Sequence, residues 1–464
     1  MGHDGVNPHI VYRGTLALDI ESLDLEGQGI AHHDGKVVFV RGALPGERVL
    51  AGVVRSKPRH DVAQTLQVLK ASALRVTPRC PHYGVCGGCS MQHVDPLAQV
   101  SFKQRALEET LWHLGRVRAP QILTPLVGAA WGYRFRARLT VRHVPKKGGV
   151  LVGFHEKGSS YVADMRECHT LPAHVSAMLL PLRALVAGLS IRDRMPQIEV
   201  AIGEAEAGER VTALVFRVLD APGAADREAL AEFARAHEVE LWLQPGGPDT
   251  IALLWPARGS TLRYTLPEFG VVVPFAPTDF TQVNAGINRS LVERAVRLLD
   301  VGPADTVLDL FCGLGNFTLA LATRARRVIG IEGARGLIER ARANAQVNRA
   351  AREARGLPFG ELSFQVANLF DFDAAAWAAL GDVDRLLIDP PRDGALAVAK
   401  VLASAAHRPR RIVYVSCNPA TLARDLGILV HEGGWELAGA GVVNMFPQTS
   451  HVESIAVLDR ADGA

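Results

Sequence analysis

Short β-type runs alternate with helix-like stretches through the last part of the chain, from about residue 271. The runs read TVLDL, RVIGI, LSFQVA, DRLLI and RIVYV, with helical patterning between them. Nearly continuous apolar strands separated by helices are typical of a parallel sheet that carries helices on both faces. The sequence therefore predicts a doubly wound α/β domain over residues 271–464. Ligands bind such folds at the carboxyl ends of the strands.

A glycine turn follows the first of these strands, in DLFCGLGNFTLALA, Asp309–Ala322. Gly313 and Gly315 allow a ligand to approach the backbone closely. Glu332 ends the next strand, nineteen residues after Gly313, where an acid can accept hydrogen bonds from ribose hydroxyls. Thr318 occupies the place of the third glycine of a dinucleotide motif. These residues predict a ribose-bearing ligand without a pyrophosphate, and S-adenosylmethionine fits that description.

The fourth strand ends in DRLLIDPPRDG, which places Asp389 at the same edge of the sheet. An aromatic residue after Asp-Pro-Pro would indicate methylation of an exocyclic amine, but Arg392 stands there instead. Methylation of a cytosine carbon often involves a cysteine at this point, and none is present. Asp389 is therefore a candidate for orienting the cofactor or contacting the substrate, against the alternative of a simple strand-ending turn.

A thiol and a carboxyl group complete the candidate chemistry. Cys417 ends the next strand, in VSCNPATLARDL, and Glu453 begins the last strand-like run, in SHVESIAVL. Carbon 5 of uracil is a poor nucleophile until a thiolate adds to carbon 6, and a base must then remove the carbon 5 proton. Cys417 suits the first role and Glu453 the second, against the alternatives of a packing thiol and an exposed edge-strand carboxylate.

Residues 1–73 predict a separate small β-barrel of the oligonucleotide-binding kind. Four stretches between about residues 11 and 72 have β-type patterning, punctuated by Gly, Pro and Asp. The segment GQGIAHHDGKVVFVRGALPGE resembles the RNA-binding TRAM domain. Farther along, WGYRFRARLTVRHVPKK alternates basic with apolar residues, which predicts an antiparallel sheet with one basic face turned toward RNA.

Residues 74–270 predict a central α+β domain built around a cysteine cluster, with a helix at about 95–115 that packs on the catalytic domain. Cys80, Cys86 and Cys89 lie within ten residues, and Cys168 lies far downstream. In a chain without a secretory signal, such clustering indicates metal binding rather than disulfides. Both tetrahedral zinc and a 4Fe–4S cluster accept four cysteines. The spacing is not C-x3-C-x2-C, which argues against radical S-adenosylmethionine chemistry.

The motifs DFTQVN, DLFCGLGNF, IDPPRDG, VSCNPATLARDL and SHVES occur in the order found in the RNA (uracil-5-)-methyltransferases, which the chain closely resembles. The resemblance implies a seven-stranded Rossmann-like methyltransferase domain, with Cys417 as the nucleophile and Glu453 as the base. It further implies that Phe280 helps to hold the target base, which must leave its stack. The implied cofactor contacts, beside the Gly313 turn, are Gln282, Phe311, Asn316, Glu332, Asn368 and Asp389.

The ribosomal RNA members of this family carry a four-cysteine iron–sulfur site similar to the one here, which their transfer-RNA relatives commonly lack. The resemblance thus implies a 4Fe–4S cluster and a 23S ribosomal RNA substrate. The alternatives are a transfer-RNA uracil-5 methyltransferase and a non-catalytic RNA-binding factor with a vestigial S-adenosylmethionine pocket.

Composition and charge agree with a globular partner of RNA. Hydrophobic residues make up 48% of the 464 residues, the net charge is +3, and the pI is about 8.6. No apolar run reaches the ~20 residues that a membrane helix needs. No basic segment followed by an apolar core begins the chain, so we expect a cytoplasmic, monomeric protein with no membrane partner.

Overall fold

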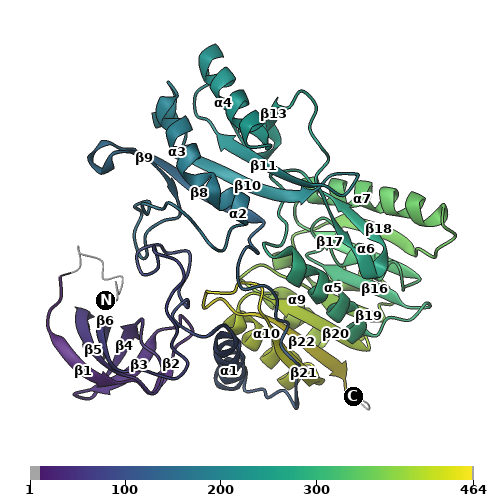
Figure 1. The fold of residues 1–464 in the computed structure, drawn as a ribbon. Coiled ribbons are helices and arrows are strands. Elements are labelled where there is room, and N and C mark those ends of the chain that lie inside the picture. The colour runs from purple at the N-terminus through teal and green to yellow at the C-terminus, as the bar shows by residue number, and fades with distance from the viewer. Residues whose placement is uncertain (1–10, 462–464) are drawn as a thin grey trace.

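The computed structural model describes residues 11–461 and contains three sheets. Figure 1 shows the N-terminal sheet at the lower left, a central sheet at the top, and the C-terminal sheet with its helices at the lower right. No helix among the described residues combines the length and apolar character needed to cross a membrane.

The N-terminal sheet has six strands in the order β1-β5-β6-β4-β3-β2. Its strands are β1 Thr15–Asp19, β2 Ser22–Leu23, β3 Gly29–His33, β4 Lys36–Arg41, β5 Arg48–Ser56 and β6 His60–Lys70. Alternate residues of β4 point inward, so that Val38 and Val40 are buried in a small core with Leu18 and Val49.

The central sheet has eight strands, with a path β13-β12-β11-β10-β14-β15 and a branch through β8 and β9. The strands are β8 Arg136–Val144, β9 Gly149–Gly153, β10 Gln197–Glu204, β11 Arg210–Arg217, β12 Glu240–Gln244, β13 Ala252–Trp255, β14 Arg263–Leu266 and β15 Val271–Pro274. Helices α2 Ala173–Ala177, α3 Leu179–Gly188 and α4 Ala224–Ala236 accompany it. Leu179 and Leu182 of α3 and Leu230 of α4 share one buried core with Leu139 and Phe216 of the sheet.

The C-terminal sheet has the order β18-β17-β16-β19-β20-β22-β21-β7. Its strands are β16 Thr306–Leu310, β17 Arg327–Glu332, β18 Glu361–Val366, β19 Arg385–Ile388, β20 Arg411–Ser416, β21 Trp435–Val443, β22 Glu453–Arg460 and the short β7 Gln121–Ile122. Its helices are α5 Ala285–Leu299, α6 Thr318–Leu321, α7 Arg335–Glu353, α8 Ala374–Ala379, α9 Leu396–Ser404 and α10 Pro419–His431. Strands β16–β20 are parallel, and β22 runs antiparallel to β20 and β21.

Each face of this sheet has its own core. Val307 packs with α5, α6 and α7, whereas its neighbour Leu308 packs with α8, α9 and α10. Helix α1, Pro96–Gly115, joins the second core through Leu107 and Leu111. A helix from the first quarter of the chain thus forms part of the C-terminal layer (Figure 1).

Two findings differ in detail from the sequence predictions. The C-terminal sheet has eight strands rather than seven, because β7 pairs in parallel with Gly439 and Ala440 of the edge strand β21. A β-carbon on Gly441 would lie 2.5 Å from the Leu123 carbonyl oxygen, so a glycine is needed for this close approach. The hairpin β14–β15 also crosses the predicted domain boundary at residue 270.

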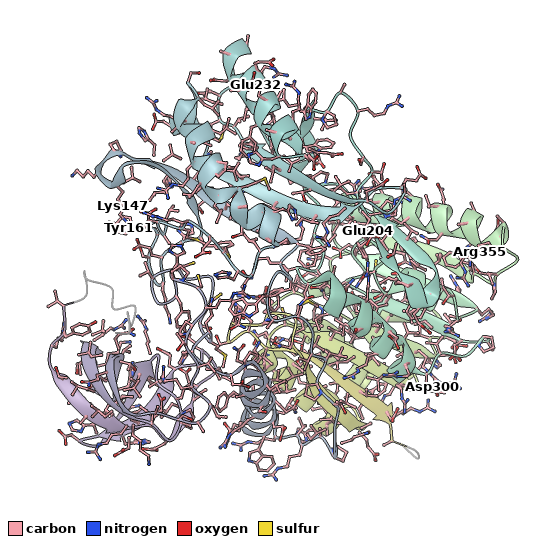
Figure 2. The ribbon with its side chains drawn as sticks, viewed as in Figure 1. Lys147, Tyr161, Glu204, Glu232, Asp300 and Arg355 are labelled. Atoms are coloured by element: carbon pink, nitrogen blue, oxygen red, sulfur yellow. The ribbon has the colours of Figure 1, made fainter. Side chains whose placement is uncertain are left out.

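The central and C-terminal sheets meet near Glu204, at the end of β10 (Figure 2). The Arg289 guanidinium of α5 lies 2.9 Å from the Glu204 carboxylate, and it also donates to the Thr265 carbonyl oxygen of β14. These contacts attach the central sheet to the helix that follows the Phe280–Asn284 segment.

Candidate functional site

One cavity of about 590 Å³ opens where the strands of the C-terminal sheet end. We call it the sheet-edge cavity. All ten residues that the sequence predicted for catalysis, cofactor and base binding line it: Phe280, Gln282, Phe311, Gly313, Asn316, Glu332, Asn368, Asp389, Cys417 and Glu453. The fold brings together residues spread over more than 170 positions, and their individual roles stay predictions.

The glycine turn after β16 is held in an unusual backbone conformation. Gly313 and Gly315 have φ values of +54° and +90°, and Phe311 has +63° although it carries a side chain. A non-glycine residue in this region stores strain, which is common at ligand sites. The Gly313 N–H donates to the Glu332 carboxylate at 3.3 Å, so the predicted ribose acceptor lies directly beside the turn.

Two of the predicted amide side chains already have partners in the protein. Asn316 exchanges hydrogen bonds with Asn288 at 3.0 Å, and its oxygen also accepts from the Tyr264 hydroxyl at 2.9 Å. Asn368 accepts from the Phe370 N–H at 3.2 Å. Each therefore helps to shape the cavity wall, and Asn316 has one N–H left for a ligand.

Cys417 lies between the end of β20 and the start of α10. The Asn418 side chain caps α10 by accepting from the Ala420 N–H at 3.1 Å, and Pro419 suits the first helical turn. The Asn418 amide also donates to the Arg392 carbonyl oxygen at 3.0 Å. The Asn418–Pro419 pair thus ends β20 and starts α10. It also connects the loop that carries Cys417 to the loop that follows Asp389.

The antiparallel pairing of β20 with β22 brings Cys417 toward Glu453. Ser416 is paired with Ser454, and the Ser454 hydroxyl donates to the Ser416 carbonyl oxygen at 3.2 Å. The next facing positions in that register are Cys417 and Glu453, which line the same cavity.

Burial raises the pKa of three acidic groups of the cavity, Cys417, Asp389 and Glu453. It raises the pKa of Cys417 to about 11, with further upward contributions from Glu453 and Asp389 and a downward one from Arg392. It raises the pKa of Asp389 to about 7 and the pKa of Glu453, only 3% exposed, well above its usual range. The cavity therefore suits a cationic ligand, because a positive charge would favour ionisation of these groups.

Several cavity residues were not predicted as site residues. Tyr264, Phe370, Phe446 and His451 all line the wall, and Tyr264 comes from the central sheet. No local sequence pattern marks Tyr264, since only the tertiary fold brings β14 to this edge. Phe280, by contrast, was predicted and is 71% exposed at the mouth of the cavity.

A second cavity, of about 80 Å³, is lined by all four cysteines of the predicted metal set: Cys80, Cys86, Cys89 and Cys168. We call it the cysteine cavity. The thiols are free, and burial raises the pKa of Cys86 to about 11 and that of Cys89 to about 12. Within residues 11–461, however, no group of three or more His, Cys, Asp or Glu side chains is placed to hold a metal ion.

On β8, Arg138 and Arg142 are exposed on either side of buried Leu139 and Val141, as the predicted basic face requires, and Arg138 lies 3.1 Å from the Glu199 carboxylate. Arg136 differs from this pattern. Its guanidinium donates to the carbonyl oxygens of Pro277 and Asp279, each at 2.6 Å, so it braces the segment before Phe280 instead of facing solvent.

Comparison with known families gives two matches. Residues 271–461 match the family model described as tRNA (Uracil-5-)-methyltransferase, and residues 13–64 match the TRAM domain. The second match confirms the resemblance that the N-terminal sequence predicted.

Curated relatives match nearly the whole chain. The 23S rRNA (uracil(1939)-C(5))-methyltransferase RlmD of Bordetella avium is 60% identical over 95% of this chain and 90% of its own length. The protein of the same name from Burkholderia thailandensis is 59% identical over 96% and 95%. Among solved structures, the Pyrococcus abyssi tRNA (uracil-54, C5)-methyltransferase in complex with S-adenosyl-L-homocysteine has a TM-score of 0.68. It is 22% identical and covers 96% of this chain and 100% of its own, which shows a shared fold.

Proposed function

This chain belongs to the RNA (uracil-5-)-methyltransferase family, and from that premise we propose that it methylates carbon 5 of a uridine in 23S ribosomal RNA. The relatives at 58–60% identity carry that activity in their names. The observation that carries the proposal is the shared wall of Cys417, Asp389 and Glu453 in one cavity at the carboxyl edge of the sheet.

Cys417 serves as the nucleophile in this reaction. Its sulfur forms a bond to carbon 6 of the uracil, and the electron pair of the carbon 5–carbon 6 double bond then makes carbon 5 nucleophilic. Because the pKa of the thiol is about 11, it is protonated at neutral pH until its surroundings change. The Arg392 guanidinium and a cationic ligand both favour the thiolate.

Glu453 serves as the base that ends the reaction. Once carbon 5 carries the methyl group, a Glu453 oxygen takes the proton from that carbon. The released electron pair restores the double bond, and the bond from carbon 6 to the Cys417 sulfur breaks. The burial that raises the pKa of Glu453 also makes its carboxylate a stronger base once it has ionised.

S-adenosylmethionine supplies the methyl group as a positively charged sulfonium when it is bound. The residues around the cavity fit such a molecule in two respects. The Gly313 turn and Glu332 suit the ribose, and the buried carboxyl groups Asp389 and Glu453 suit a positive charge. We propose that Gln282, Phe311, Asn316 and Asn368 complete its contacts.

Phe280 holds the target base in this account. Its ring is exposed at the mouth of the cavity, where an unstacked base can lie against it on the way to Cys417. Arg136 braces the backbone at Asp279 and thereby fixes the segment that presents this ring.

We further propose that the four cysteines hold a 4Fe–4S cluster, with zinc as the alternative. The cluster would cross-link the Cys80–Cys89 loop to Cys168 and supply no electron to the methyl transfer. What supports metal binding is the shared cavity and the burial of its thiols, which a metal would deprotonate. The four cysteines suit either group, because tetrahedral zinc and a 4Fe–4S cluster both take four thiolates.

The first two domains would bind the RNA. We propose residues 1–73 as a TRAM module, residues 74–270 as the iron–sulfur and RNA-binding domain, and residues 271–464 as the methyltransferase domain. The protein would act as a monomer in the cytoplasm, where ribosomal RNA is found. The exposed Arg138 and Arg142 on β8 support the assignment of an RNA-facing surface.

The experiment that tests the proposed function maps 5-methyluridine in 23S ribosomal RNA from cells with and without this gene. We expect one or more uridines to lose the methyl group in the deletion strain and to regain it with the wild-type gene but not with Cys417→Ala. Unchanged 23S RNA with loss of transfer-RNA methylation would favour the transfer-RNA alternative. No change in either RNA, with no S-adenosylmethionine binding by the purified protein, would favour the non-catalytic alternative.

A further inference from the structure

The loop between β21 and β22, residues 444–452, forms one wall of the sheet-edge cavity. Phe446 and His451 of this β21–β22 loop line the cavity, and Glu453 follows it directly. The loop therefore adds to the β20–β22 pairing in setting where the proposed base lies relative to Cys417.

Lys103 of α1 forms hydrogen bonds with two residues of this loop, Asn444 and Phe446. It is 2% exposed, and its amine donates to the Asn444 side-chain oxygen at 2.8 Å and to the Phe446 carbonyl oxygen at 2.9 Å. Within residues 11–461, no charged group contributes to the pKa shift of Lys103, which burial alone causes. Burial lowers the pKa of Lys103 to about 7, and a neutral amine still has two N–H donors for these two acceptors.

Gln99, one helical turn earlier, makes a reciprocal pair with the same loop. Its side chain donates to the Gln448 side-chain oxygen at 3.0 Å and accepts from the Gln448 N–H at 2.9 Å. Gln448 is 1% exposed and has a φ of +68°, a left-handed conformation that costs energy for a residue with a side chain. The pair with Gln99 helps to hold Gln448 in this conformation.

The loop that contains Cys80, Cys86 and Cys89 also contacts Gln448. The N–H groups of Ser90 and Met91 both donate to the Gln448 carbonyl oxygen at 3.0 Å. The Ser90 hydroxyl accepts from the Ser450 N–H at 2.8 Å. Ser90 follows Cys89, a wall residue of the cysteine cavity, so one peptide bond separates that wall from the contact to the β21–β22 loop.

Simple packing does not explain this set of contacts. Burying an amine against neutral acceptors is costly, and apolar side chains of similar volume would pack α1 against the sheet at lower cost. A left-handed, buried Gln448 adds a second cost at the same place. Such polar contacts fix one geometry without stabilising the fold. They are expected where a reactive group must be placed precisely.

We propose that Lys103 and Gln99, together with Ser90, are positioning residues that fix the β21–β22 loop and thereby place Glu453 for proton removal from the Cys417-bound uracil. This inference rests on the proposed function and extends it to residues more than 340 positions away in the chain. The loop directly precedes the proton acceptor Glu453 and does not carry the Cys417 sulfur. Displacing the loop should therefore slow removal of the carbon 5 proton more than addition of Cys417 to carbon 6 of the uracil.

The test measures steady-state methylation of an RNA fragment by wild type, Lys103→Met and Gln99→Leu. Lys400→Met is the matched control, since Lys400 is an exposed lysine on α9. We expect both loop variants to lower kcat by about 10-fold or more, because small misplacements of a reactive group have effects of that order. The KM for RNA and the Kd for S-adenosylmethionine should stay within about twofold of wild type.

Two further readouts separate positioning from a general loss of structure. The fraction of enzyme covalently attached to RNA at steady state should rise in both variants, because the adduct forms but is released slowly. Amide hydrogen exchange should accelerate at Gln448 and Ser450 and stay unchanged in β16 and β19. The exchange measurement needs no activity, so it tests the loop contacts even if the proposed function fails.

Wild-type kcat in both variants, or unaltered exchange in residues 444–452, would overturn the proposal. A fall in kcat without adduct accumulation, with weakened binding of S-adenosylmethionine, would also overturn it, because that pattern indicates a structural role. Failure of the proposed function itself has a different signature: wild type and Lys400→Met would form no 5-methyluridine in the same RNA.

Discussion

The sheet-edge cavity and the cysteine cavity both contain thiols with raised pKa values, yet they surround them with different neighbours. Cys417 lies with Asp389 and Glu453 in a cavity of about 590 Å³, where the second thiol, Cys312, is only 3% exposed. The other cavity is about 80 Å³ and is lined by four cysteines. A cavity wide enough for a nucleoside, with one partly exposed thiol beside two carboxyl groups, suits an organic substrate, whereas four thiols around a small cavity suit an inorganic group.

The two cavities also suit two different uses of cysteine, one reactive and one structural. The chemistry proposed for Cys417 requires that its bond to carbon be made and broken in each turnover. The four thiols around the small cavity would stay bound to one group and connect distant segments of the chain.

Replacing Cys417 by Ala should abolish methylation, with a loss of at least ~10³-fold, because Cys312, the other thiol at the cavity, is only 3% exposed and burial raises its pKa well above the usual value. The measurement is tritium release from RNA that carries 5-tritiated uridine. Binding of S-adenosylmethionine should be retained, which serves as the control for folding. Full tritium release by the variant would remove the covalent role from Cys417.

Replacing Cys89 or Cys168 by Ser should remove the bound metal and lower the melting temperature by several degrees or more. The measurement is iron, sulfide and zinc content together with visible absorption of anaerobically purified protein. Cys312→Ala is the control, because Cys312 is a buried thiol that does not line the cysteine cavity. A colourless wild-type protein containing zinc would contradict the cluster, and a metal-free wild type would contradict both forms of the proposal.

Replacing Phe280 by Ala should lower kcat/KM for RNA by about 10- to 100-fold, the usual range for one base-stacking contact. The effect should be confined to the RNA, because the exposed ring lies at the mouth of the cavity. Phe280→Tyr, which keeps a stacking surface, should restore most of the activity. An alanine variant that matches wild type, or that loses S-adenosylmethionine binding instead, would speak against the assignment.

Affinity for S-adenosylmethionine should rise by about 3- to 10-fold between pH 6 and pH 8, since the pKa of Asp389 is about 7. Below that pKa the carboxyl group is neutral and attracts a cation poorly; above it the group is ionised. S-adenosylhomocysteine lacks the sulfonium charge and is the matched control, with a weaker pH dependence. Equal pH dependence for both ligands in calorimetric titrations would contradict the electrostatic role of Asp389.

The sequence was most informative where chemistry depends on strand ends. Once the alternation of strands and helices predicts a parallel sheet, Gly313, Asp389 and Cys417 must meet at one edge, and the structure places them there. The Asn418–Pro419 pair also predicted where β20 ends, because helix capping depends on local sequence.

Other features depend on contacts that no local pattern reports. Tyr264 reaches the cavity from another sheet, and β7 adds an eighth strand to the edge of β21. Lys103 looks like an ordinary helix residue in the sequence, yet it is buried against the β21–β22 loop. Arg136 belongs to a run of basic residues that suggested RNA contact, but its guanidinium binds backbone carbonyls.

The most direct test of the central claim uses Glu453→Gln with RNA and S-adenosylmethionine, followed by mass spectrometry of the protein. The variant keeps Cys417 but lacks the carboxylate that would take the carbon 5 proton, so the methylated base cannot leave. We expect a stable protein–RNA adduct attached at Cys417, formed with about one methyl group per adduct and with turnover lowered by about 10²- to 10⁴-fold. Rapid release of 5-methyluridine without an adduct, or an adduct at another cysteine, would contradict it.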